Sequence, residues 1–181
     1  TVDGIIGAAY GSAGERCMAV SVAVAVGDIA DQLVDNIHSK IQQLKVLPWT
    51  NDEADMEPLI SKEHLAKVTN YIDIGVKEGA KIIADGRNYK IQGYENGYFI
   101  GPTLFDNVND KMTIYREEIF GPVVAVMSFS DEEEAVQLSN DVPFGLVAGV
   151  WSGEHRRKEH AQRGSAMVGR SGRQPRQPQL R

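Results

Sequence analysis

The chain has 181 residues, enough for one domain with a substantial core, and its hydrophobic content of 42% is that of an ordinary globular protein. Its net charge of −6 is unevenly distributed, because residues 154–181 carry eight Lys and Arg against two Glu, whereas residues 1–153 carry 11 basic against 23 acidic residues. An acidic body argues against general nucleic-acid binding, since affinity for phosphate needs clustered cations. One cysteine cannot form an internal disulfide, and no apolar run of membrane length or secretory leader is present, so we expect a cytoplasmic protein with no membrane association.

A helix is predicted at the start of the chain, because apolar residues recur there at helical spacing: Val2, Ile5, Ile6, Ala9 and Tyr10. The stretch 11–19 follows this helix and contains the only cysteine, Cys17. Glycines at positions 11 and 14 allow a tight turn, and Arg16 places a permanent cation next to a thiol whose nucleophilic form is the anion. We therefore interpret Cys17 as a candidate nucleophile, with a small buried hydrophobic residue as the alternative interpretation.

Strands and helices are expected to alternate over the middle of the chain. An apolar run over 18–26 predicts a strand buried on both faces, and Asp28 is the expected N-cap of an amphipathic helix over 29–45. The polar segment 48–58 predicts a surface loop. A second amphipathic helix is expected after this loop, over residues 61–78.

The second helix has recognisable signals at both ends, with Ser61 as its N-cap and Gly79 as its stop. Further strands are expected over 81–84, 98–105, 123–129 and 144–151, with one more helix following the N-cap Asp131. This alternation predicts a three-layer α/β/α domain with a mostly parallel sheet over residues 1–153.

The apolar pattern stops after residue 153. Residues 154–181 are rich in arginine, glutamine, glycine and proline, a composition typical of disordered segments. We interpret this segment as a basic tail that is disordered or the product of a shifted reading frame. A phosphate-binding arm is the alternative interpretation.

Three motifs occur in chain order: Gly-Glu-Arg-Cys-Met-Ala at 14–19, Gly-Pro-Thr-Leu at 101–104 and Glu-Glu-Ile-Phe-Gly-Pro at 117–122. Together they resemble the aldehyde dehydrogenase superfamily. The arginine directly before the cysteine resembles most closely the methylmalonate-semialdehyde dehydrogenase branch, whose members acylate coenzyme A. The resemblance covers about residues 1–153 and implies part of the catalytic domain of a longer, oligomeric enzyme, so the chain looks like a fragment.

The resemblance implies a role for four residues. Cys17 would attack the aldehyde carbonyl, and Arg16 would bind the carboxylate of a semialdehyde acid, with a surface ion pair as the alternative role for this arginine. Glu118 and Phe120 would bind the nicotinamide ribose and the ring end of NAD, whereas their alternative roles are a solvated charge and a core aromatic residue. Glu117 should face elsewhere than Glu118, because side chains alternate in an extended chain.

The implied reaction is oxidation of a malonate- or methylmalonate-type semialdehyde with NAD, through a thiohemiacetal and a thioester on Cys17, followed by acyl transfer to coenzyme A. One alternative is a hydrolytic NAD(P)-dependent aldehyde dehydrogenase, and another is a non-catalytic module with only an association role. The chain contains no Gly-x-Gly-x-x-Gly turn for a dinucleotide, so we expect the isolated chain to be inactive. Its four histidines have no spacing that predicts a metal site.

Overall fold

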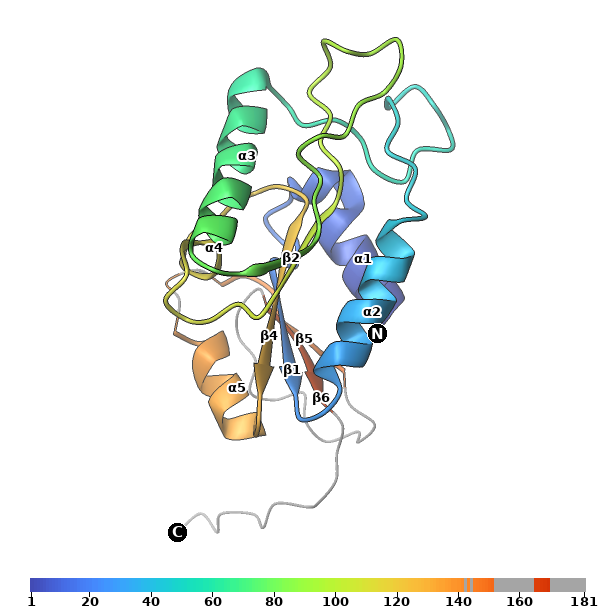
Figure 1. Cartoon of the computed structure of the whole chain (residues 1–181). Coiled ribbons are helices and arrows are strands. Elements are labelled where there is room, and N and C mark those ends of the chain that lie inside the picture. The colour runs from blue at the N-terminus through green and yellow to red at the C-terminus, as the bar shows by residue number, and fades with distance from the viewer. Residues whose placement is uncertain (142, 144, 152–164, 170–181) are drawn as a thin grey trace, which may run out of the picture.

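The computed structural model describes residues 1–141, 143, 145–151 and 165–169. These residues form one sheet in the order β2-β3-β4-β1-β6-β5, in which every neighbouring pair is parallel except β2 with β3. The sheet runs through the middle of the molecule (Figure 1). Its strands are β1 (Val22–Val26), β2 (Lys81–Ala84), β3 (Thr103–Asp106), β4 (Val123–Phe129), β5 (Gly149–Trp151) and β6 (Ser165–Gly169).

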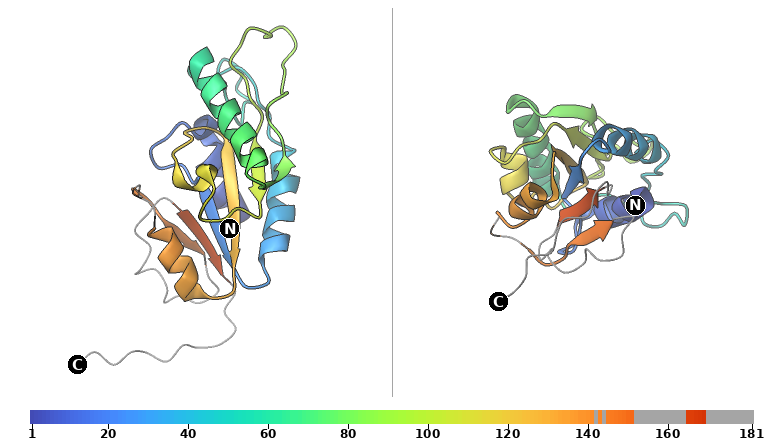
Figure 2. Two further views of the ribbon diagram at one scale, coloured as in Figure 1. Left: turned by 60° about the vertical axis from the view of Figure 1, so that its left-hand side comes forward. Right: turned by 90° about the horizontal axis from the view of Figure 1, so that it is seen from below.

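Helices cover both faces of the sheet, as Figure 2 shows in the view from below. One face carries α1 (Val2–Tyr10) and α2 (Ala30–Ile41), and the other carries α3 (Lys62–Lys77), α4 (Thr113–Arg116) and α5 (Glu132–Ser139). A short 3₁₀ helix, Gly11–Gly14, follows α1 directly. The predicted three-layer arrangement with a mostly parallel sheet is therefore confirmed. Within the described residues, no helix is both long and apolar enough to cross a membrane.

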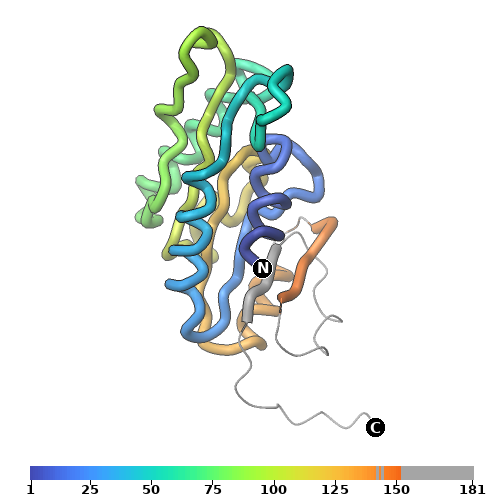
Figure 3. Tube along the Cα trace, turned by 90° about the vertical axis from the view of Figure 1, so that its right-hand side faces the viewer, coloured from blue at the N-terminus to red at the C-terminus, as the bar shows by residue number. Residues whose placement is uncertain are grey.

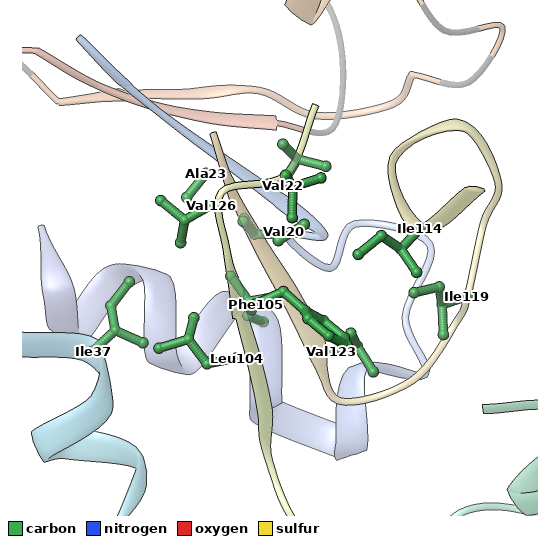
Figure 4. Packing of buried hydrophobic residues seen from close by; sticks show 14 of the residues in the cluster. Val20, Val22, Ala23, Ile37, Leu104, Phe105, Ile114, Ile119, Val123 and Val126 are labelled. Atoms are coloured by element: carbon green, nitrogen blue, oxygen red, sulfur yellow. The ribbon is translucent and has the colours of Figure 1, made fainter. Parts of the chain in front are cut away.

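The core lies on both sides of β3 and β4. Leu104 and Phe105 are consecutive in β3 and fully buried on opposite faces, with Leu104 directed towards Ile37 of α2 (Figure 4). On the other face α3 approaches very closely, because a Cβ atom on Gly75 would lie 3.0 Å from side-chain atoms of both Phe105 and Ile114. Burial on both faces explains why the parallel strands are rich in valine and alanine.

Two predicted helix caps are confirmed. The Ser61 hydroxyl accepts a hydrogen bond from the His64 N–H at the start of α3, and the Asp131 carboxylate accepts one from the Glu134 N–H at the start of α5. Gly79, with φ of +97°, follows the end of α3 as predicted. These ends were predictable because a cap depends on residues close in sequence.

Several predicted boundaries were wrong. Helix α2 begins at Ala30 with Ile29 at its N-cap position, so Asp28 is not the cap, and it ends at Ile41 because Lys45 instead bonds to residues 55 and 56. Strand β1 begins at residue 22 rather than 18, because the preceding segment bonds back to α1 through the Val20 N–H and the Ala8 carbonyl.

The predicted strands over 98–105 and 144–151 are also shorter than expected. Residues 98–101 bond to Leu59 and Gly86 rather than to a neighbouring strand, so β3 begins only at Thr103. The last predicted strand is reduced to β5, and residue 144 lies outside the described residues.

Strand β6 corrects the expectation that everything after residue 153 is a tail. Residues 165–169 lie between β1 and β5 and pair in parallel with both. Their sequence, Ser-Ala-Met-Val-Gly, is a short apolar run that the surrounding basic residues obscured. Residues 152–164 and 170–181, to which the rest of that expectation applies, lie outside the described part of the chain.

Two long connections, residues 42–61 and 85–102, extend beyond the same end of the sheet (Figure 3). This is the end at which β1, β3 and β4 begin, as the direction of the arrows shows in Figure 1. The motif segments at 14–19, 101–104 and 117–122 all lie at or just before the first residues of these three strands. The fold therefore gathers the three motifs at this end of the sheet.

Candidate active site

The candidate nucleophile loop, residues 11–20, and the segment 116–122 meet at the end of the sheet where the parallel strands begin. Each of them precedes one of the neighbouring strands β1 and β4. The closest approach is between Gly14 and Gly121. A Cβ atom on Gly14 would lie 2.3 Å from the Gly121 carbonyl oxygen, and Gly14 also has φ of +69°. Only glycine satisfies both the left-handed backbone and the close approach of the two backbones.

The nucleophile loop contains a left-handed turn. Ser12 and Ala13 have φ values of +51° and +52°, and Gly14 continues the turn. For residues other than glycine this conformation costs of the order of 1–3 kcal/mol each. Such a backbone is maintained only where surrounding contacts fix it, and it often marks a functional loop.

Cys17 lies after this turn and is exposed, as its proposed role requires. Its backbone N–H has no hydrogen-bond acceptor among the described residues, so both the thiol and this donor are free to face a substrate. A thiol and a nearby N–H are the two groups needed to attack a carbonyl and to stabilise the oxyanion that forms.

Arg16 makes a contact that the sequence did not predict. Its Nη2 donates hydrogen bonds to the carbonyl oxygens of Gly7, at 2.6 Å, and Ala8, at 3.2 Å, and so caps the C-terminal end of α1. A cation is favourable there because the last carbonyls of a helix carry partial negative charge. Gly11 leaves room for this contact, since a Cβ atom on it would lie 2.8 Å from Nη2.

The capping contact leaves other donors of Arg16 available. Its Nε and Nη1 have no acceptor in the part of the chain that the structure describes. A guanidinium has five N–H donors, so a carboxylate can bind here while the cap persists. The substrate-binding role of Arg16 stays a prediction.

The carboxylates of Glu117 and Glu118 have different surroundings. The Tyr71 hydroxyl of α3 donates a 2.7 Å hydrogen bond to Glu117 Oε2, and this bond, together with burial, raises the pKa of Tyr71. Glu118 is exposed, and its carboxylate has no partner among the described residues. Glu118 is therefore the carboxylate that is free to accept hydrogen bonds from a ligand.

Phe120 is partly exposed and has an unusual backbone for an aromatic residue, with φ of +60°. Its ring packs edge to face against the imidazole of His64, with the centroids 6.3 Å apart. Its carbonyl oxygen accepts a 2.6 Å hydrogen bond from Nε2 of the same imidazole. A fixed and partly exposed ring suits flat apolar support of a cofactor.

Two residues of this site were not expected from the sequence. Glu15 accepts a hydrogen bond from the Ile60 N–H at 3.2 Å and lies 3.3 Å from Nε2 of His64. The sequence placed His64 on a helix but gave no sign of a partner, because its two contacts are 49 and 56 residues away. No group of three or more metal-ligating side chains exists among the described residues.

The model of the aldehyde dehydrogenase family matches residues 1–170 of this chain. The chain belongs to the aldehyde dehydrogenase family. The match continues past residue 153 and includes β6, in agreement with the place of that strand in the sheet.

Relatives of known name point to one group within the family. The chain is 52% identical over 145 residues to the malonate-semialdehyde dehydrogenase of Pseudomonas aeruginosa, which covers 80% of this chain and 29% of the relative. It is 47% identical over 153 residues to the human acylating mitochondrial methylmalonate-semialdehyde/malonate-semialdehyde dehydrogenase, covering 84% of this chain and 28% of the relative.

A solved structure agrees with this grouping. A Sinorhizobium meliloti protein, crystallised with NAD as a candidate methylmalonate-semialdehyde dehydrogenase, superposes with a TM-score of 0.81 at 42% identity, covering 93% of this chain and 35% of that one. The chain thus spans about 30% of the length of the relatives it matches. It is an aldehyde dehydrogenase family fragment related to NAD-dependent malonate- and methylmalonate-semialdehyde dehydrogenases.

The role of Glu118 and Phe120 in binding NAD stays a prediction, and their surroundings in this aldehyde dehydrogenase fragment leave both side chains accessible. A free carboxylate can accept hydrogen bonds from both hydroxyls of a ribose, and Glu118 has one exposed. Phe120 offers an aromatic face held by the backbone contact to His64. Both residues belong to the segment that contacts the nucleophile loop through Gly121.

Proposed function

We propose that this chain supplies the nucleophile and part of the cofactor site for NAD-dependent oxidation of a malonate- or methylmalonate-type semialdehyde. The observation that carries the proposal is the exposed Cys17, which directly follows a partly free guanidinium and lies in a loop packed against the Glu118–Phe120 segment. The names of the relatives support the same substrate class.

The first step is addition of the Cys17 thiolate to the aldehyde carbon. A C–S bond forms, the carbonyl π bond breaks, and the resulting oxyanion is stabilised by the free N–H of Cys17. Glu118 and Phe120 would hold NAD, which would supply the hydride acceptor needed to convert the thiohemiacetal on Cys17 to a thioester. The oxyanion returns its electron pair to re-form the carbonyl as the hydride leaves.

The second step releases the acyl group. The thiol of coenzyme A loses its proton to solvent and attacks the thioester carbon, the bond to Cys17 breaks, and the cysteine leaves as a thiolate ready for another cycle. The acylating name of the human relative supports coenzyme A as the acceptor. Water is the acceptor in the alternative, a hydrolytic NAD(P)-dependent aldehyde dehydrogenase.

Arg16 gives the proposed site its selectivity for an acid. A semialdehyde of this class carries a carboxylate at the far end from the aldehyde, and a guanidinium next to the nucleophile can bind that carboxylate through two hydrogen bonds. The donors that do not cap α1 are available for this contact. The other alternative, a folded module that only associates with partners, needs neither the exposed thiol nor the free donors.

The test runs the second step in reverse and requires no NAD. The 181-residue chain is incubated with malonyl-CoA, and its intact mass is measured. We expect one malonyl group on the parent chain, none on the Cys17→Ser variant, and slower transfer from acetyl-CoA, which lacks the carboxylate. A parent chain that stays unmodified, or that is acylated equally in the serine variant, would contradict the proposal and favour the non-catalytic module.

A further inference from the structure

His64 lies between the two segments of the candidate site and contacts both. It is the third residue of α3, its side chain is only 15% exposed, and its Nε2 lies 2.6 Å from the Phe120 carbonyl oxygen and 3.3 Å from Glu15 Oε1. A carbonyl oxygen and a carboxylate oxygen only accept hydrogen bonds, so Nε2 must carry a proton. The shorter contact, to the Phe120 carbonyl, is the hydrogen bond, and the Glu15 carboxylate places a second oxygen close to the same N–H.

Helix α3 runs alongside the segment 116–122 and contacts it at several positions. Its contacts are the hydrogen bond from Tyr71 to Glu117, a 3.5 Å contact from Lys67 Nζ to the Glu118 carbonyl, and Val68, whose side chain lies where a Cβ atom on Gly121 would be. Together with His64 these residues follow the spacing of three and four that places side chains on one helical face. Among the described residues of that face, His64 is the one whose polar contacts include the nucleophile loop.

The backbones on either side of His64 are both in left-handed conformations. Phe120 has φ of +60°, and the turn at Ser12 and Ala13 precedes Glu15 by two to three residues. A strained backbone persists only when its surroundings determine it. The bond to the Phe120 carbonyl fixes one of these backbones, whereas Glu15, which contacts the Ile60 N–H and His64, ties the other to the N-terminal end of α3.

We propose that His64 is a positioning residue that holds the Cys17 loop and the Glu118–Phe120 segment in fixed relation to each other. The catalytic consequence rests on the proposed function, because only a reaction between a substrate on Cys17 and a cofactor near Phe120 needs the two segments aligned. The coupling itself is a property of the folded chain and can be measured without any ligand.

The experiment measures amide hydrogen exchange by mass spectrometry in the 181-residue chain and in three variants. His64→Leu removes the donor, and His64→Gln replaces it with an amide N–H that can reach the same carbonyl. His38→Leu is the matched control, since His38 lies on α2 and its ring is hydrogen-bonded to Gln42, a neighbour on the same side of the molecule as α2 and not a residue of either segment. Informative amides are those of Glu15, Ile60 and Glu117, which are all hydrogen-bonded in the parent.

We expect exchange to become at least threefold faster in His64→Leu in both segments, 11–20 and 116–122, with α5 unchanged. His64→Gln should return both segments towards the parent rate, and His38→Leu should leave them unchanged. Faster exchange confined to the first turn of α3, or a glutamine variant that behaves like the leucine variant, would overturn the proposal.

A second variant keeps the test decisive if His64→Leu does not fold, as judged by far-ultraviolet circular dichroism. Glu15→Ala removes the partner on the other side, and the coupling predicts faster exchange over 116–122, about 100 residues away in the sequence. Unchanged exchange there would reject the proposal. Malonyl transfer to Cys17 is measured separately. The hydrogen-exchange result therefore tests the role of His64 even if Cys17 is not acylated, and acylation of Cys17 tests the proposed function even if exchange is unchanged.

Discussion

The backbone of Gly14 packs directly against the carbonyl group of Gly121, so closely that a Cβ atom on Gly14 would lie 2.3 Å from the oxygen. This contact joins the loop that carries Cys17 to the segment that carries Glu118 and Phe120. Because the atoms in contact belong to the two main chains rather than to flexible side chains, the two segments cannot come closer to each other at this point. This contact therefore brings the candidate nucleophile loop next to the segment of the candidate cofactor residues.

Gly14→Ala should destabilise the chain by about 2–4 kcal/mol, because the new methyl group meets backbone atoms and alanine disfavours φ of +69°. The matched control is Gly7→Ala. Gly7 lies inside α1 and a Cβ atom there would meet nothing within 4 Å, so we expect a gain of about 0.5–1 kcal/mol. Urea unfolding followed by circular dichroism measures both, and equal effects of the two changes would reject the account.

Arg16→Gln should lower stability by about 0.3–1 kcal/mol through loss of the charged cap on α1. For a chain of this length 1 kcal/mol corresponds to about 2–4 °C in the unfolding temperature. The loss should shrink in high salt, since an exposed charge at a helix end is screened. Arg16→Lys keeps the charge but not the shape of the donor, so we expect it to retain part of the stability. No change in either variant would show that the cap contributes nothing.

Cys17 should react with iodoacetamide in the folded chain at a rate within about threefold of the rate in denaturant, because its side chain is exposed. The chain has one cysteine, so the stoichiometry is one label per molecule. Intact mass spectrometry over time gives both rates. Strong protection of the native thiol would favour an inert, buried cysteine and would contradict both the structure and the proposed role.

Part of this arrangement was predictable from local sequence. The caps at Ser61 and Asp131 and the stop at Gly79 depend on neighbours within a few residues, and the structure confirms them. The alternation of strands and helices likewise indicated the layered sheet, because each apolar run must find a partner layer.

The rest depended on contacts between distant segments. Arg16 was interpreted as a substrate or ion-pair residue, but its cap on α1 appears only once the loop folds back over Gly7. His64 gave no signal because its partners come from two other loops. Strand β6 was missed because its apolar run is short, Ala-Met-Val within a basic stretch, and its partners β1 and β5 are distant from it in the sequence.

Stability in acid should depend on Asp85. Hydrogen bonds from Arg87, including one of 2.9 Å from its Nε, lower the pKa of Asp85 below its ordinary value of 3.8, and Arg87 also pairs with Asp73 on α3. A depressed carboxylate pKa stabilises the fold fully above the ordinary value, and this contribution is lost as the pH falls through the lower, folded value.

We therefore expect Asp85→Asn to be less stable than the parent by about 0.5–1 kcal/mol at pH 6, because the pair is partly exposed. The difference between the two chains should begin to shrink as the pH falls below 3.8, the ordinary pKa, and should disappear only below the lower pKa of Asp85 in the folded chain. Urea unfolding over a pH series measures it. A difference that persists unchanged at the lowest pH would show that the charge is not the cause.

The 181-residue chain alone should produce no NADH above background from malonate semialdehyde and NAD. Glu118 and Phe120 can hold only the nicotinamide end of the dinucleotide, and the sequence contains no Gly-x-Gly-x-x-Gly turn to bind the pyrophosphate. Correct positioning of reactants contributes on the order of 7–11 kcal/mol to an enzymatic rate, so a weakly bound cofactor loses most of that advantage.

The control is the Pseudomonas aeruginosa malonate-semialdehyde dehydrogenase under the same conditions, followed by absorbance of NADH. Malonyl transfer to Cys17 without NADH formation would show that the nucleophile works and that the chain lacks a complete binding site for NAD. Robust NADH formation would show that these residues bind NAD by themselves and would overturn this prediction.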